Sequence, residues 1–295
     1  MNMQRLFLLL CFFVPLVSAH AQTELQKDLA RTYIIWQKAM VNKDVRGWES
    51  IVSSERKKEV KNKIYSEKFK YPAQIFNTPV PPPSTRDLKM LQAKASGTDA
   101  KAVFFGKVNF DVGGEPEQNL LVVSYQKEGG RWRFVKAEYV NLTNLPDIRK
   151  QIQNKDYSYL SHADFQPLPY QRKSYIELKS PVSIITKLYA YCPGREVKAS
   201  YNKRSNHLFQ NEQEAEIAIG GSKSGLNEIS MSIKSLPGGQ KNEPITVRVY
   251  LFSQVEGVQP IKAYEYLVKE GGKVDGIVSK TFEITPEMVN KLHGR

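Results

Sequence analysis

The stretch Thr246-Val247-Arg248-Val249-Tyr250-Leu251 decides the fold of the second half of this chain. Val247, Val249 and Leu251 alternate with polar or aromatic residues at every second position. Successive side chains of a β-strand point to opposite faces, so this alternation predicts a strand with one buried face.

Similar β-rich runs lie on both sides of this stretch, separated by Gly-rich turns. Their number and spacing predict an all-β sandwich over residues 175–295, with a short C-terminal helix capped at Thr285. The sandwich is immunoglobulin-like only in a generic sense, because the Cys-Trp-Cys pattern of immunoglobulin domains is absent. The expected strands are Val182–Tyr191, Glu196–Tyr201, Glu214–Ile219, Glu228–Ser235, Ile245–Ser253, Ile261–Lys269 and Ile277–Ile284.

The first half of the chain opens with helical periodicity. A capping box at Thr23 precedes apolar residues at spacings of three and four, Asp44 can cap a second helix, and a polar third helix is expected at 54–64. The apolar residues of the first helix are Leu25, Leu29, Tyr33, Trp36 and Met40.

Prolines at 79–83 end the helical part, because proline fits neither a helix interior nor a central strand. Four strands are expected beyond them, with turns at Gly113-Gly114 and Gly129-Gly130. Three helices followed by an antiparallel meander predict an α+β unit over residues 22–143. The expected strands are Asp87–Ala95, Ala102–Asp111, Leu120–Gln126 and Trp132–Asn141.

The order "LARTYIIWQKAMVNKDVRGWESIVS", hairpin strands and a closing "EGGRWRFVKAEYV" resembles the NTF2-like superfamily, which includes SnoaL-like and ketosteroid-isomerase-like domains. The resemblance covers about residues 24–141 and implies a cone in which a curved sheet wraps the first helix. The Pro-rich stretch departs from the pattern of that family. The expected fold class is therefore α+β, an N-terminal NTF2-like cone followed by the sandwich.

Two further segments complete the expected organisation. Residues 144–174 are expected to be a linker with a short helix near Pro146. Residues 1–21 resemble a secretory signal peptide, with a charged start, an apolar run and an Ala19-His20-Ala21 cleavage motif before Gln22. The expected location is thus extracytoplasmic, periplasmic or secreted, with no transmembrane segment after processing. Cys192 alone would remain, as a buried structural thiol or an intermolecular disulfide.

Charge suggests a class of partner. The chain carries a formal net charge of +13, and the excess of Lys and Arg lies mainly in the first half. Outside the cytoplasm this favours an anionic envelope polymer, lipid headgroups or an acidic envelope protein over nucleic acid, unless the cations serve solubility alone. A homodimer is left open. The candidate anion-binding residues, on the third helix, are Arg56, Lys57, Lys58 and Lys61.

Aromatic residues of the first half are the candidate ligand-binding set, because the resemblance implies a concave apolar pocket. The alternative is that they fill the core. These residues are Tyr33, Trp36, Trp48, Phe104, Tyr125, Trp132 and Tyr139.

Catalytic chemistry is sparse. The His-Asp base that many NTF2-like proteins use is missing, which leaves Glu138 as the weak catalytic candidate. No pair of His or Cys residues has zinc-site spacing, and the Gly220-Gly221-Ser222-Lys223-Ser224-Gly225 segment lacks the Lys of a phosphate loop. No metal and no cofactor are expected.

The leading hypothesis is an exported non-catalytic binding or assembly protein of the cell envelope. The alternatives are a pocket-based isomerase- or hydrolase-like enzyme with Glu138 as base, and a scaffold subunit of an envelope secretion or cell-wall machine.

Overall fold

The computed structural model describes residues 14–108, 117–168, 176–239 and 242–295. The described chain forms two compact units by its internal contacts. Unit 1 comprises residues 1–57 and 75–173, and unit 2 comprises residues 58–74 and 174–295. Of the expected leader, only residues 14–21 are described, as the first turns of a helix, and the expected turn at Gly113-Gly114 lies outside the described residues.

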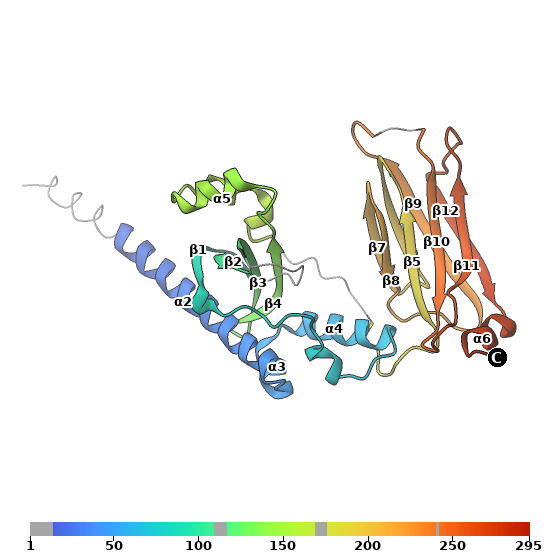
Figure 1. The fold of residues 1–295 in the computed structure, drawn as a ribbon, viewed down its shortest axis with the longest axis horizontal. Helices are drawn as coiled ribbons and strands as arrows, with labels where there is room; N and C mark the ends of the chain where they lie inside the picture. The colour runs from blue at the N-terminus through green and yellow to red at the C-terminus, as the bar shows by residue number, and fades with distance from the viewer. Residues whose placement is uncertain (1–13, 109–116, 169–175, 240–241) are drawn as a thin grey trace, which may run out of the picture. The chain divides into compact units, whose positions relative to one another are not determined.

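Unit 1 holds the first four-stranded sheet, an antiparallel meander in the order β1-β2-β3-β4 (Figure 1). The helices before it are α2 (Val14–Val41), α3 (Val45–Ile51) and the start of α4 (Ser54–Ser66), and 3-10 turns lie at Ala73–Phe76 and Thr85–Asp87. The strands are β1 (Leu88–Ser96), β2 (Asp99–Lys107), β3 (Gln118–Glu128) and β4 (Arg131–Val140). They are followed by α5 (Pro146–Gln153) and 3-10 turns at Ser158–Ser161 and Ala163–Phe165.

Helical segments cover both faces of this sheet. On one face α2 places Trp36 against Phe134 of β4, with the rings stacked at a centroid distance of 3.9 Å. On the other face Ile152 of α5, Leu160 and Phe165 join a core cluster with residues of β2 and β3. A sheet covered on both faces needs apolar residues on both, which explains why β2 and β3 are buried almost continuously rather than in alternation.

The turn between β3 and β4 forms as expected. Glu128 pairs with Arg131, so Gly129 and Gly130 make a two-residue hairpin loop. Both have positive φ, 56° and 78°. This conformation suits the twist of the two strands and costs glycine nothing.

Unit 2 contains two four-stranded antiparallel sheets, in the orders β11-β10-β5-β8 and β12-β9-β6-β7 (Figure 1). Inward side chains of both sheets form one core cluster, which includes Leu188, Val197, Ile229 and Val247. Thr285 caps the terminal helix α6 (Pro286–Leu292) by accepting a hydrogen bond from the Met288 amide. The strands are β5 (Ile185–Tyr191), β6 (Arg195–Tyr201), β7 (Ser205–Gln210), β8 (Gln213–Ile217), β9 (Gly225–Ser235), β10 (Ile245–Phe252), β11 (Ile261–Val268) and β12 (Ile277–Ile284).

The expected fold class, α+β with an N-terminal NTF2-like cone, is wrong. The described chain is mostly β, with twelve strands in three antiparallel sheets and five α-helices. Two packing choices explain the difference. Most of α4 belongs to unit 2 rather than to the first sheet, and residues 144–165, expected within a linker, cover the second face of that sheet.

Side chains of α4 show why it joins unit 2. Asn62 is fully buried, donates from Nδ2 to the Ile176 carbonyl at 2.6 Å and accepts at Oδ1 from the Leu178 amide at 2.8 Å. Ser66 accepts from the Gly220 amide at 3.0 Å. A helix that is polar by sequence is thus docked through hydrogen bonds rather than through an apolar stripe.

Candidate functional site

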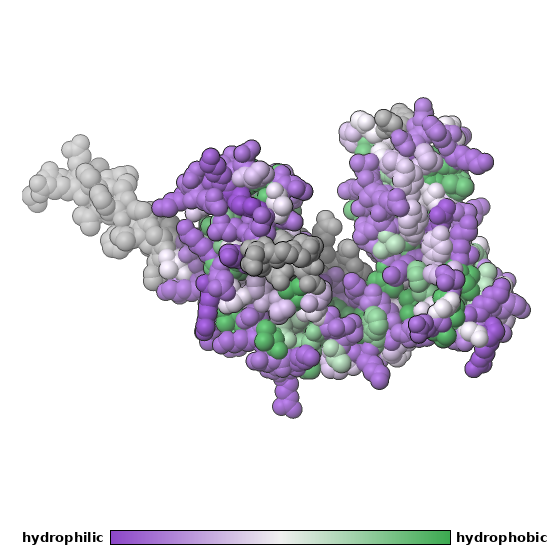
Figure 2. All heavy atoms as spheres, in the orientation of Figure 1, coloured by the Kyte–Doolittle hydropathy of each residue, from purple (hydrophilic) through white to green (hydrophobic). Residues whose placement is uncertain are grey.

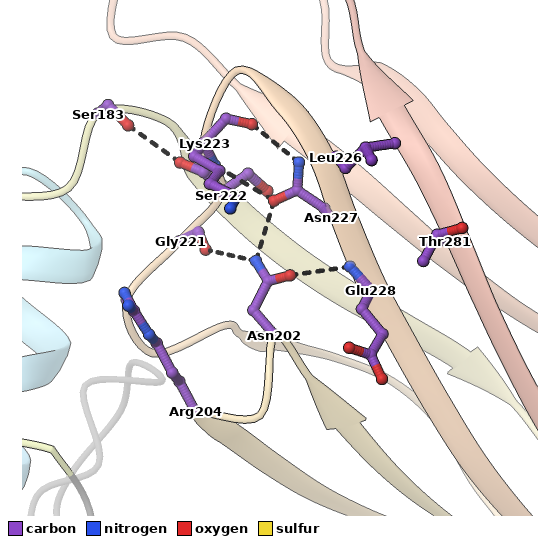
Figure 3. Close-up of a pocket in the computed structure, with 11 residues that line it drawn as sticks. Ser183, Asn202, Arg204, Gly221, Ser222, Lys223, Leu226, Asn227, Glu228 and Thr281 are labelled. Atoms are coloured by element: carbon purple, nitrogen blue, oxygen red, sulfur yellow. Dashed lines mark hydrogen bonds between the residues drawn. The ribbon is translucent and has the colours of Figure 1, made fainter.

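A polar pocket of about 380 Å³ lies in unit 2 (Figure 3). The turn after β6, the loop before β9, and the outer faces of β9 and β12 meet there. Its lining residues are Ser183, Asn202, Arg204, Gly220, Gly221, Ser222, Lys223, Leu226, Asn227, Glu228 and Thr281.

Two asparagines hold the wall of this pocket. Asn202 donates to Asn227 Oδ1 at 2.9 Å and accepts from the Glu228 amide at 2.9 Å. Asn227 in turn donates to the carbonyls of Lys223 at 2.8 Å and Gly225 at 3.0 Å. Because each amide is fixed by several partners, the pocket shape exists before any ligand binds.

The backbone amides of the loop before β9 are bonded within the protein. The Gly221 amide donates to the Ala218 carbonyl at 3.0 Å, the Ser222 amide to the Ile184 carbonyl at 3.1 Å, and the Lys223 amide to Asn227 at 3.2 Å. A phosphate loop needs amides that point at its ligand, and these amides are already used. The segment connects β8 to β9, which belong to different sheets, so it is not a hairpin loop.

Below the pocket lies a buried line of hydroxyls. Ser222 Oγ is 2.6 Å from both Thr186 Oγ1 and Tyr201 Oη. Burial raises the pKa of the Tyr201 phenol to about 12, although its hydrogen bond to Ser222 opposes that shift. The phenol therefore stays protonated at neutral pH and anchors the loop as a neutral group.

Charged and apolar groups define what the pocket can bind. Arg204 and Lys223 have exposed side chains at its edge, and Glu228 lies 3.4 Å from the ammonium of Lys203. Leu226 is 64% exposed and provides an apolar surface beside them. This arrangement suits a small ligand with one anionic group and further hydrogen-bonding groups.

A second polar arrangement joins the edges of the two sheets in unit 2. Ser205 Oγ lies 2.8 Å from His207 Nε2, and His207 Nδ1 lies 2.5 Å from Glu216 Oε2. The order Ser-His-Glu resembles that of a serine hydrolase, but Ser205 is only 1% exposed and accepts the Ile219 amide at 2.8 Å. A nucleophile must reach its substrate, so we interpret this chain of contacts as a structural bridge between β7 and β8.

The predicted aromatic ligand-binding residues are divided between core and surface. Tyr33 contacts the rings of Trp36 and Phe104 at centroid distances of 5.5 and 5.8 Å, and its hydroxyl donates to the Pro83 carbonyl at 2.8 Å. The buried members of the set are Tyr33, Trp36, Trp48, Phe104 and Tyr125. Trp132 is half-buried beneath the Lys127 ammonium, and Tyr139 is 43% exposed.

Glu138, the weak catalytic candidate, lies at the surface. Its carboxylate accepts a hydrogen bond from the Lys136 ammonium at 2.7 Å. A catalytic base of this kind is usually buried in the site, whereas Glu138 is exposed and its carboxylate is already paired with a cation.

The predicted anion-binding residues Arg56, Lys57, Lys58 and Lys61 are half-buried rather than solvated. Lys57 donates to the Glu49 carbonyl at 3.0 Å, and Lys61 pairs with Glu177 at 2.9 Å. Arg56 and Lys58 also have interaction partners. The structure thus uses these cations within the protein, and a ligand anion would have to compete with those contacts.

Among the described residues, no three His, Cys, Asp or Glu side chains gather as a metal site. No described helix combines the length and apolar character needed to cross a bilayer. Cys192 is buried, as expected, and desolvation raises the pKa of its thiol.

Sequence reasoning missed the pocket of Figure 3 and the Ser205–His207–Glu216 bridge. One signal for the bridge was present, because Ser205 and His207 stand two apart on one strand and therefore share a face. Nothing local indicated that Asn202 and Asn227 would meet. Comparisons with protein-family models, curated proteins and solved structures found no match.

Proposed function

We propose that this chain is an exported, non-catalytic binding or assembly protein of the cell envelope, and that unit 2 presents its small-ligand pocket. The observation that carries the proposal is the Asn202–Asn227 network, which holds a polar pocket open with Arg204 and Lys223 at its edge. A preformed pocket loses little conformational entropy on binding, which suits recognition. The leader-like residues 1–21 support export.

The ligand-binding half of the proposal is tested with small anionic probes. Glycerol 3-phosphate and glucuronate represent the phosphate and carboxylate of envelope polymers and lipid headgroups. Titration calorimetry should detect binding of at least one probe, and the double variant Arg204→Gln/Lys223→Gln should weaken it about tenfold, since two charge-assisted contacts are lost. The matched control is Lys234→Gln/Lys273→Gln, which removes two exposed cations of unit 2 outside the pocket.

Two results would count against this site. Equal weakening in both double variants would mean that bulk charge attracts the probes. Binding of neither probe by the unmodified protein would remove the anionic-ligand assignment.

The export half is tested by the mass of the secreted or periplasmic protein. The chain is expressed with its own N-terminus in a Gram-negative host, and the extracytoplasmic fraction is measured as intact protein. The expected N-terminal residue is Gln22. A full-length chain found only in the cytoplasm would contradict export.

A further inference from the structure

A second hollow, of about 530 Å³, lies in unit 1 between the start of β1, the end of β2 and the end of α5. We call it the α5 groove. Its volume falls within the range of about 300–1,000 Å³ typical of small-ligand sites. Its residues are Arg86, Asp87, Leu88, Lys89, Leu91, Phe105, Gly106, Lys107, Gln118, Ile152, Gln153, Lys155 and Tyr157.

Apolar side chains form the floor of the groove. Leu88, Phe105 and Ile152 are buried, while Leu91 and Tyr157 are half-buried. All but Leu88 belong to or pack against the core cluster on this face of the sheet. The register of β1 and β2 shifts between Met90 and Gln92, so Leu91 is an extra residue in an edge strand. Such a bulge re-aims side chains, and here the shifted residue lines the groove.

Four cations surround this floor, against one carboxylate, that of Asp87. Arg86 and Lys89 stand on one continuous stretch, whereas Lys107 ends β2 and Lys155 follows α5. Each of the four side chains is exposed. No ion pair joins any of them to an acidic side chain within the described parts of the chain. In Figure 2 the surface over α5 is strongly hydrophilic.

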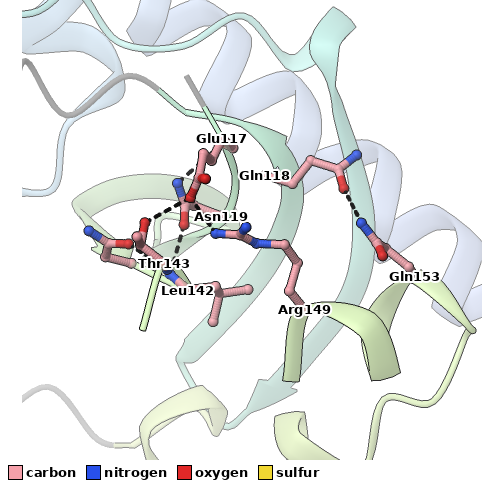
Figure 4. Close-up of polar contacts among 8 residues, drawn as sticks. Glu117, Gln118, Asn119, Leu142, Thr143, Arg149 and Gln153 are labelled. Carbon is pink, nitrogen blue, oxygen red and sulfur yellow. Dashed lines mark hydrogen bonds and ion pairs between the residues drawn. The ribbon is translucent and has the colours of Figure 1, made fainter. Parts of the chain in front are cut away.

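The groove is built rather than incidental, because polar contacts fix α5 against β3 (Figure 4). Arg149 of α5 donates to Glu117 at 2.6 Å, and Gln153 donates to Gln118 at 2.7 Å. Thr143 also donates to Glu117 at 2.9 Å. Hydrogen bonds from Arg149 and Thr143 lower the pKa of Glu117, so its carboxylate stays ionised at neutral pH and keeps these contacts.

We propose that the α5 groove binds an acidic peptide segment of a partner protein, with an apolar side chain on the floor and flanking carboxylates beside the four cations. Charge complementarity selects an anionic partner. The concave shape and apolar floor favour a peptide over a lipid surface or a nucleic acid, because a bilayer is flat and nucleic acid recognition uses exposed stacking aromatics. This inference goes beyond the proposed function, since it names another site in the other unit.

The probe is a fluorescein-labelled octapeptide of six glutamates around a central Leu-Phe pair, measured by fluorescence anisotropy with the full chain. The variant Arg86→Gln/Lys89→Gln/Lys107→Gln/Lys155→Gln should weaken binding about tenfold or more, because four exposed ion pairs each contribute a modest amount. The matched control, Arg46→Gln/Lys38→Gln/Lys43→Gln/Lys63→Gln, removes the same number of exposed cations elsewhere. It should change affinity less than about twofold.

A second comparison tests the floor. Replacing the central Leu-Phe pair of the probe by Ser-Ser should weaken binding to the unmodified protein. That penalty should shrink in Leu91→Ala, because the variant has already lost the apolar contact. A structural defect in Leu91→Ala would weaken the binding of both peptides by the same factor.

Four outcomes would overturn the proposal. The first is that the octapeptide does not bind, and the second is that both quadruple variants lose the same affinity for it. The third is that anionic phosphatidylglycerol vesicles or an oligothymidylate bind as tightly as the octapeptide or more tightly. The fourth is a concentration-dependent dimer, abolished by the groove variant, which would make a second copy the occupant. Because the small-ligand pocket lies in unit 2, either proposal can fail without the other.

Discussion

Asn62→Ala is the most informative single substitution, because it tests why residues 58–74 belong to unit 2. The side chain is fully buried and joins α4 to the backbone of Ile176 and Leu178. Removing it leaves one backbone donor and one acceptor without a protein partner, and each buried orphan costs roughly 1–3 kcal/mol.

Contact with solvent reduces the total cost of these two unpaired groups. Ile176 is exposed, so water can reach its carbonyl, while Leu178 is half-buried. We therefore expect the free energy of unfolding of unit 2 to fall by about 2–3 kcal/mol, which corresponds to a lower Tm by about 8 °C for a unit of this size.

The assay uses probes that report on one unit each. Trp36, Trp48 and Trp132 all lie in unit 1, whereas the buried thiol of Cys192 lies in unit 2. In a urea titration of residues 22–295, thiol labelling should begin at lower urea in Asn62→Ala, and the tryptophan fluorescence midpoint should stay in place. Lys63→Ala, at the exposed neighbouring position, should change the free energy of unfolding by no more than about 0.5 kcal/mol with either readout.

The reasoning fails if the tryptophan midpoint falls while the Cys192 midpoint does not move. That result would place the contacts of α4 in the stability of unit 1.

Three further predictions concern unit 2. Hydrogen bonds from two lysines lower the pKa of Glu177 from 4.5 to about 2, so this ion pair stabilises the fold above about pH 4.5 and is lost as pH falls towards 2. In Glu177→Gln, the free energy of unfolding measured in urea should therefore fall less between about pH 5 and about pH 3 than in the unmodified protein. Gly221→Ala should lower the free energy of unfolding, measured by calorimetry, by about 2 kcal/mol or more, since φ is 54° and the new Cβ would overlap the Ile184 carbonyl. An unchanged Tm would refute this strain. Ser205→Ala removes the acceptor of the Ile219 amide beside His207, so hydrogen exchange at that amide should accelerate. An unchanged exchange rate would show that this hydrogen bond does not protect the amide.

Local sequence determined where most strands and several turns form, although β7 was not predicted and the cap expected at Thr23 lies inside α2. The alternation of Thr246–Leu251 predicted a strand with one buried face, and β10 spans Ile245–Phe252 with that burial pattern. Gly129-Gly130 predicted the hairpin turn, and Asp44 and Thr285 predicted helix caps that the structure contains. Each of these features depends on backbone geometry within a few residues, which the residue types set directly.

The tertiary structure alone decided which of those elements pack together. The sequence of residues 54–64 predicts a polar helix. Its assignment to unit 2 rests on distant contacts, such as the hydrogen bonds with Ile176 and Leu178, over 110 residues away in the chain. Residues 144–165 read as a linker because they are short and proline-bearing, yet they cover a face of the first sheet. The α+β cone prediction was wrong for these two reasons.

Both binding surfaces also depend on the tertiary structure. Asn202 meets Asn227 at a loop between two sheets, and the cations of the α5 groove come from three separate stretches of the chain. Periodicity reports which face of an element is buried, but not which distant element buries it. That choice depends on complementary shape and on paired polar groups across long separations in the chain, which only the folded structure brings into contact.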